Sequence, residues 1–116
     1  MEASAPKEKL PVPMEEFMKL ELRVAEIESV TPHPNADRLY VLGIRVGDTK
    51  KQIVAGVRKH YGEAELMGKK IIVVNNLAPA VIRGVESQGM LLAASIGDTL
   101  SLVTPERPMD HGAQVK

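Results

Sequence analysis

The sequence predicts an all-β domain, a small and partly closed barrel of five strands. Several short runs of apolar and β-branched residues are separated by turn signals, and a single helical segment lies between the third and fourth of them. The chain has 116 residues and no cysteine. It is therefore long enough to form one hydrophobic core without disulfides or a thiolate metal site.

The first 13 residues are expected to form a flexible N-terminal arm, because they include three prolines and several small residues. Residues 14–116 are expected to form one folded domain. Residues 14–19 favour one helical turn, from which Phe17 is expected to pack on the barrel.

The first strand begins after Leu20 and changes face along its length. Leu22 and Val24 point to one side, and the apolar pattern then switches to Ile27. Such a switch predicts a bulge near residues 25–26, which lets one long strand serve two sides of a small barrel.

A loop is expected at residues 31–37, because its two prolines prevent regular pairing. Residues 47–49 have the composition of a hairpin turn, and residues 64–66 favour a helical turn. The other strands are expected at residues 39–46, 52–57, 70–74, 90–94 and 100–103. A five-stranded barrel with a short helix between strands 3 and 4 is the OB-fold, whereas a β-sandwich needs more strands.

The sequence gives little support for a membrane protein, a secreted protein or an enzyme. No apolar run approaches the roughly 18–20 residues of a membrane span, and the N-terminus lacks a signal peptide's apolar core, so a cytoplasmic location is expected. His33, His60 and His111 lie in separate segments without metal-ligand spacing, and Ser87 is not in a G-x-S-x-G motif. We therefore expect no catalytic residue, no metal and no cofactor.

Charge is unevenly distributed although the formal net charge is zero. Residues 38–83 carry nine basic and three acidic side chains, whereas the segments on either side are net acidic. A polyanion responds to the local potential of the face that it meets, so this distribution favours a nucleic-acid partner. The alternative is that these lysines only solvate exposed turns.

The most informative stretch runs from Asn76 to Met90. A turn at Pro79 is followed by a glycine-flanked polar cluster at residues 83–89, and an apolar run begins directly afterwards. Polar side chains at the mouth of a buried strand are typical of the binding face of a small β-barrel.

Five ordered motifs carry a resemblance to a known family. They are residues 21–27 (ELRVAEI), 33–39 (HPNADRL), 53–57 (IVAGV), 76–79 (NLAP) and 84–90 (GVESQGM). The set closely resembles the structure-specific tRNA-binding domain family. Its members occur free-standing, at the C-terminus of methionyl-tRNA synthetases and in endothelial monocyte-activating polypeptide cofactors.

The resemblance covers residues 14–116. It implies an OB-fold that binds tRNA by overall shape without modifying it. It also implies a homodimer formed through segments outside the barrel, here expected in the C-terminal extension. The chain would act as a free tRNA-binding protein or as a small chain of a methionyl-tRNA synthetase.

Carried over by residue, the resemblance places two segments at the RNA. In the first, His33, Asn35 and Arg38 would face the ligand, and the neighbouring prolines would stiffen the loop. Asn35 and Asp37 could instead only cap the turn. Asn76 either contacts RNA or closes the turn at Pro79.

In the second segment, Arg83, Ser87 and Gln88 offer a guanidinium, a hydroxyl and an amide. These groups suit phosphate oxygens and the ribose 2′-hydroxyl. Many members of the family carry basic residues where this chain has Ala80 and Val81. This chain is therefore expected to bind tRNA more weakly, or to depend more on other cations. Those cations are Arg45, Lys50, Lys51, Lys69 and Lys70.

Two other functions remain open at this point. A related branch of the fold acts as a secretion-linked chaperone, although it lacks the His-Pro-x-Ala-Asp loop. The chain could also be a docking or dimerisation appendage that binds protein partners.

Overall fold

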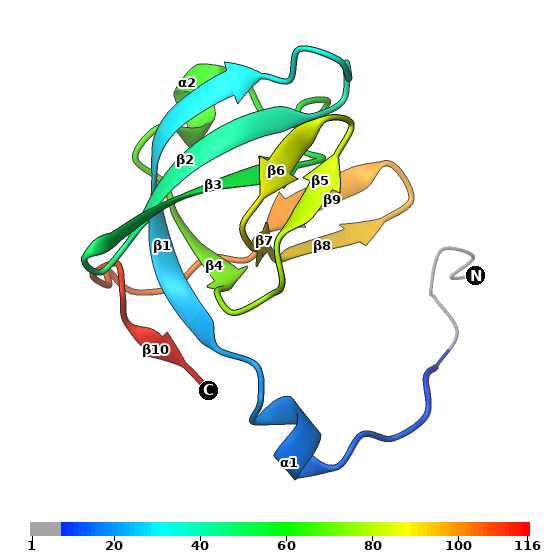
Figure 1. The fold of residues 1–116 in the computed structure, drawn as a ribbon, viewed down its shortest axis with the longest axis vertical. Helices are drawn as coiled ribbons and strands as arrows, with labels where there is room; N and C mark the ends of the chain where they lie inside the picture. Colours follow the sequence, from blue (N-terminus) through cyan, green and yellow to red (C-terminus); the bar gives the residue numbers. More distant parts are fainter. Residues whose placement is uncertain (1–7) are drawn as a thin grey trace.

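The computed structural model describes residues 8–116. Its centre is an antiparallel sheet of strand order β3-β2-β1-β4-β7, curled into a partial barrel, with a sixth short strand, β10, beside β1 (Figure 1). The predicted five-stranded barrel is confirmed, and so is the helix between strands 3 and 4. The strands of this sheet are β1 (Leu22–Pro32), β2 (Tyr40–Val46), β3 (Thr49–Ala55), β4 (Lys70–Val74), β7 (Met90–Leu91) and β10 (Gln114–Val115), and helix α2 spans Glu63–Leu66.

Strand β1 serves two sides of the barrel, as its apolar pattern predicts. Its first half, from Leu22 to Glu26, pairs with β4, and its second half, from Glu26 to Pro32, pairs with β2. The bulge lies between Ile27 and Ser29, so the prediction near residues 25–26 was about two residues early. Ala25 and Ile27 both face the core, so the strand is regular between them. The apparent change of face arose because Val24 is also apolar and buried, but it lies under the C-terminal segment instead of in the core.

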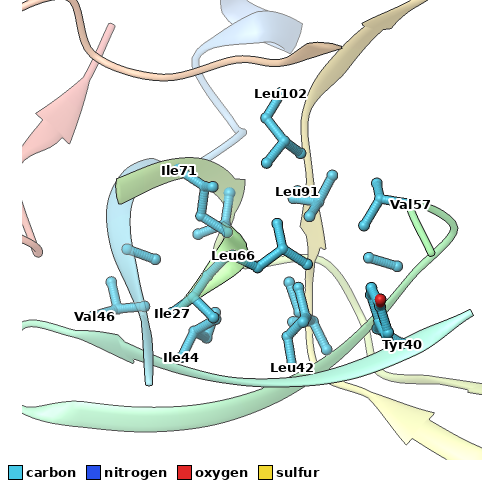
Figure 2. Close-up of a cluster of buried hydrophobic side chains, with 14 residues drawn as sticks. Ile27, Tyr40, Leu42, Ile44, Val46, Val57, Leu66, Ile71, Leu91 and Leu102 are labelled. Carbon is cyan, nitrogen blue, oxygen red and sulfur yellow. The ribbon is translucent and has the colours of Figure 1, made fainter. Parts of the chain in front are cut away.

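The core fills the inner face of the curled sheet (Figure 2). Strand β2 alternates strictly between buried and half-buried residues, so Leu42 and Ile44 point inward. Leu66 of α2 is fully buried and lies among the side chains from the strands, which closes one end of the barrel. Burying one leucine side chain contributes about 1.5–3 kcal/mol, which explains how so short a helix stays in place.

Two hairpins outside the central sheet differ from the prediction. Residues 76–90 contain a hairpin of β5 (Ala80–Ile82) and β6 (Val85–Ser87) that contacts β3. The expected buried strand at residues 90–94 breaks at Leu92, whose N–H and C=O bond to Ile72 and Val103. Beyond it, β8 (Ala93–Ile96) is exposed and pairs only with β9 (Thr99–Leu102) among the described strands.

The C-terminal segment returns to the barrel. Strand β10 pairs with the start of β1, on the side where β2 has already ended. Gly112 lies so close to the β2–β3 turn that a Cβ there would come within 3.0 Å of the Gly47 Cα. The extension therefore completes the sheet of its own subunit.

The N-terminal helix α1 (Met14–Phe17) stands away from the barrel (Figure 1). It has no buried residue, and Phe17 is 42% exposed, so the expected packing of Phe17 on the barrel was wrong. Of the predicted arm, residues 1–7 lie outside the described residues and residues 8–13 form neither helix nor strand. Within the described chain, no helix has the length and apolar character needed to cross a membrane.

We predict that Gly89→Ala destabilises the fold more than Gly68→Ala. Both glycines have positive φ, +154° and +78°, so alanine is strained at either position. A Cβ at Gly89 would also lie 3.0 Å from the Val74 carbonyl oxygen, whereas nothing lies within 4 Å at Gly68. Urea unfolding should show a loss of about 1–2 kcal/mol for Gly68→Ala and a clearly larger loss for Gly89→Ala. Equal losses of unfolding free energy in the two variants would contradict a steric clash between the new Cβ at position 89 and the Val74 carbonyl oxygen.

Candidate nucleic-acid interface

The β5–β6 hairpin presents an arginine at a strained backbone position. Its two-residue turn, Arg83-Gly84, has φ values of 54° and 92°, which defines a type I′ turn. The left-handed conformation costs a non-glycine residue about 1–2 kcal/mol. Arg83 is the single non-glycine residue with positive φ among residues 8–116. Such strain persists where the surrounding structure enforces it.

Arg83 is held by the loop at residues 33–38. Its Nη2 donates to the backbone oxygen of Asn35 at 3.0 Å, and the side-chain amide of Asn35 donates back to the Arg83 carbonyl at 3.3 Å. Around this joint lies a hollow of about 420 Å³, which we call the arginine hollow. It is lined by Asn35, Ala36, Asp37, Arg38, Leu39 and Arg83. The two segments that the sequence analysis singled out are thus brought together.

His33 lies beneath the loop and is 4% exposed. Its Nδ1 accepts the backbone N–H of Asn35 at 2.9 Å. With Nδ1 unprotonated, the network assigns the proton to Nε2, which donates to the Ile82 carbonyl at 3.0 Å. The expectation that His33 faces the ligand does not fit this burial. Instead the ring joins the loop to β5 and fixes Asn35 and Arg83 relative to one another.

Two further arginines belong to this region: Arg38 ends the loop, and Arg58 contacts it from another segment. Arg38 is exposed and lines the arginine hollow, where its guanidinium is accessible to a ligand. Arg58, which the sequence analysis missed, donates to the Ala36 carbonyl at 3.4 Å, and its guanidinium carbon lies 5.9 Å from the centre of the Tyr40 ring. It supports the loop from within. Its position three residues after the end of β3 was the available signal.

Ser87 and Gln88 do not line the arginine hollow. Ser87 is 3% exposed, and its Oγ accepts from Val54 N and donates to Gly89 O, both at 2.9 Å. Its hydroxyl is therefore fully used in attaching the hairpin to β3. Gln88 is half-buried, and its side-chain oxygen accepts the backbone N–H of Gln52 at 2.9 Å. Both were expected at the ligand because their groups are polar, but both hold the hairpin in place.

Asn76 also has a structural position. Its side-chain oxygen accepts Glu21 N–H, and its side-chain nitrogen donates to the Lys19 carbonyl, both at 2.8 Å. These bonds anchor the connection between α1 and β1. These partners do not belong to the Pro79 turn, and the RNA contact of the exposed Asn76 stays a prediction.

The basic residues of the β2–β3 hairpin lie apart from the arginine hollow. Arg45 is five residues beyond Tyr40 along β2, a distance of about 17 Å. Its Nε donates to Glu28 at 2.9 Å, and the Lys50 ammonium lies 3.8 Å from the same carboxylate. Lys51 faces the other way, and its Nζ donates to the Asn75 carbonyl. Neighbouring residues of a strand alternate between faces, so Lys50 and Lys51 do not form one cationic pair.

Glu28 responds to the cations beside it. The hydrogen bond from Arg45 holds the pKa of this carboxyl below its ordinary value of 4.5, and the charges of Arg45, Lys50 and His111 add to the effect. Glu28 in turn neutralises part of the positive charge on this face.

A small β-barrel with a rigid, arginine-lined hollow at its rim is typical of nucleic-acid-binding barrels. The family model described as "Putative tRNA binding domain" matches residues 22–114. The chain therefore belongs to the tRNA-binding domain family, as its motifs indicate. Within residues 8–116, no three His, Asp or Glu side chains are grouped so that they could hold a metal ion.

Three relatives illustrate this membership. The chain is 48% identical over 105 residues to the methionine–tRNA ligase of Thermococcus kodakarensis, a match that covers 90% of this chain and 14% of the ligase. The MetRS-related protein of Pyrococcus horikoshii has 31% identity and a TM-score of 0.86, and the match covers 93% of this chain and all of that one. The CsaA chaperone protein of Picrophilus torridus has 31% identity and a TM-score of 0.85, over 91% of this chain and all of that one.

We predict that Glu28→Gln flattens the loss of stability in acid. Because the folded-state pKa of Glu28 is lowered, its stabilisation is present above about pH 4.5 and is lost as the pH falls through the lower, folded-state value. The variant lacks this titration, so the difference in unfolding free energy between about pH 7 and pH 3 should be smaller than in the parent. Urea unfolding at each pH measures this difference. If the unfolding free energy falls equally with pH in the two proteins, Glu28 does not contribute to the loss of stability in acid.

Proposed function

We propose that this chain binds folded tRNA at the arginine hollow and does not modify it. The observation that carries the proposal is the reciprocal contact between Asn35 and Arg83, which fixes a guanidinium beside an open, partly cationic hollow. An arginine fixed in advance loses less side-chain entropy when it meets a phosphate. Membership of the tRNA-binding domain family supports the same ligand.

Contacts to backbone and shape fit this site better than base stacking. The exposed groups at the arginine hollow are Asn35, Asp37, Arg38 and Arg83, so two cations face a single carboxylate. The aromatic ring nearest the loop, Tyr40, is 5% exposed, and its hydroxyl donates to the Tyr61 carbonyl. A folded RNA offers phosphates at fixed separations, which a rigid site of this kind can recognise.

The relation to methionine–tRNA ligase suggests where the bound tRNA is used. The matched region makes up 14% of the length of the Thermococcus kodakarensis ligase. We propose that the chain raises the local concentration of tRNA for such a ligase, as a free protein or as a small separate chain. This role places it in the cytoplasm, where tRNA is aminoacylated.

We also propose that the chain forms a homodimer through its N-terminal segment. Val12, Met14, Phe17 and Leu20 surround an apolar hollow of about 520 Å³ and are all exposed. Exposed apolar surface of this kind is typical of an interaction site. The expected contribution of the C-terminal extension to the dimer stays a prediction, because the strands described there pair within one subunit.

The chaperone alternative rests on the similarity to the CsaA chaperone protein of Picrophilus torridus. Measuring tRNA affinity across a series of salt concentrations separates the two functions. Binding to phosphates weakens steeply with salt. Failure to bind tRNA at low salt, together with suppression of the aggregation of an unfolded protein, would favour the chaperone.

We predict that Arg83→Ala weakens tRNA binding by about 1–2 kcal/mol, or about five- to thirtyfold, because a charge-assisted hydrogen bond is lost. The slope of log affinity against log salt should fall by about one unit. Lys9→Ala, in the exposed N-terminal segment, is the control with the same change of charge and should change neither quantity. An unaltered affinity in folded Arg83→Ala would remove Arg83 from the site.

We predict that Phe17→Glu converts the homodimer to a monomer, because it places a charge in the apolar N-terminal surface. Sedimentation equilibrium measures the mass of each protein. Val81→Glu is the matched control: Val81 is an exposed apolar residue on β5, away from α1, and its change should leave the mass unaltered. A monomeric parent, or a dimeric Phe17→Glu, would disprove this interface.

A further inference from the structure

The outer face of the sheet carries a row of charges in register. The core residues Ile44 and Ile71 point inward, so their strand neighbours Arg45 and Lys70 point outward. Glu26 pairs with Lys70 on one side and with Arg45 on the other. The row therefore runs from β4 across β1 to β2.

At the β4 end of this row lies a groove between the start of β4 and the C-terminal segment, which we call the C-terminal groove. Its volume is about 460 Å³. It is lined by Lys69, Lys70, Thr104, Pro105, Glu106, Arg107, Pro108 and Met109. Three cations thus share one hollow with a single carboxylate.

These cations differ from those of the β2–β3 hairpin in how they are paired. Arg45 and Lys50 both lie within 4.0 Å of Glu28. Among residues 8–116, no carboxylate lies within 4.0 Å of the charged groups of Lys69, Lys70 or Arg107. Lys70 is nevertheless fixed in place, because its Nζ donates to the Met109 carbonyl at 2.9 Å. The positive charge of the groove is therefore available to a ligand.

We infer that the C-terminal groove is a second phosphate-binding site, which holds the backbone of the same RNA that enters the arginine hollow. Ammonium and guanidinium groups suit phosphate oxygens, and the Thr104 hydroxyl can donate as well. The inference rests on the proposed function. It adds that the tRNA touches two cationic sites, the arginine hollow beside the start of β2 and the C-terminal groove beside the start of β4.

The separation of the two sites would favour a folded RNA over a flexible strand. Arg45, which is in register with Lys70 across β1, lies about 17 Å along β2 from the end that adjoins the arginine hollow. A structured RNA holds phosphates at such a distance without a further loss of entropy, whereas a flexible strand has to be ordered first.

The test measures tRNA affinity across a salt series for Lys69→Gln combined with Arg107→Gln. Removing two phosphate contacts should reduce the magnitude of the salt slope by at least about one unit and lower the affinity at low salt. Lys9→Gln combined with Lys59→Gln removes the same charge from two exposed positions outside both hollows and should leave the slope unaltered. Lys70 is kept, because it also holds the C-terminal segment.

A substitution that removes a negative charge from the groove gives an independent measurement. Glu106→Gln removes the one carboxylate that lines the groove and should raise tRNA affinity about two- to fivefold at low salt. Glu8→Gln, an exposed glutamate of the N-terminal segment, is its control and should have no effect.

The outcomes distinguish this inference from the proposed function. If the parent does not bind tRNA at any salt concentration, the proposed function fails. If the parent binds and Arg83→Ala weakens binding, while the Lys69/Arg107 variant keeps the parent's slope and affinity, only the second site is disproved. A reduced slope in that variant, with unaltered controls, supports it.

Discussion

The barrel depends on a single continuous strand that changes partners in its middle. β1 is 11 residues long, and Glu26 is the point at which pairing passes from β4 to β2. The N-terminal end of β1 has no pairing with β2, and β10 pairs with it there instead. Every strand of the central sheet is therefore placed directly or indirectly by β1. The bulge after Ile27 supplies the local twist that a small barrel requires to curl.

The candidate binding face is coupled to this barrel by buried polar contacts. His33 joins the loop to β5, and Ser87 joins β6 to β3. Both side chains are almost completely buried with their hydrogen-bonding groups satisfied, which makes such contacts rigid. The hairpin could otherwise move, since strands of three residues are too short to be stable alone. Arg83 can therefore be presented in a defined orientation by a segment with little core of its own.

Most of the barrel could be predicted from the sequence because its strands alternate and its turns contain glycine or proline. The β5–β6 hairpin could not, because its strands have three residues each and Arg-Gly is an unusual type I′ turn. The loop and Arg83 were correctly placed near one another. His33 and Ser87 were taken for ligand contacts because a polar side chain in a motif looks the same whether it is buried or exposed. Lys50 and Lys51 point to opposite faces of β3 because neighbouring side chains of a strand alternate, so this could have been predicted from the sequence.

The left-handed backbone at Arg83 has an evolutionary consequence. Glycine or asparagine would occupy that turn with less strain, but either would lose the guanidinium bond to the Asn35 backbone oxygen. Retention of arginine at this position would therefore record selection for its guanidinium, either for the contact with the loop or for a ligand. The local cost of the left-handed backbone and the gain from this contact therefore oppose each other at one residue.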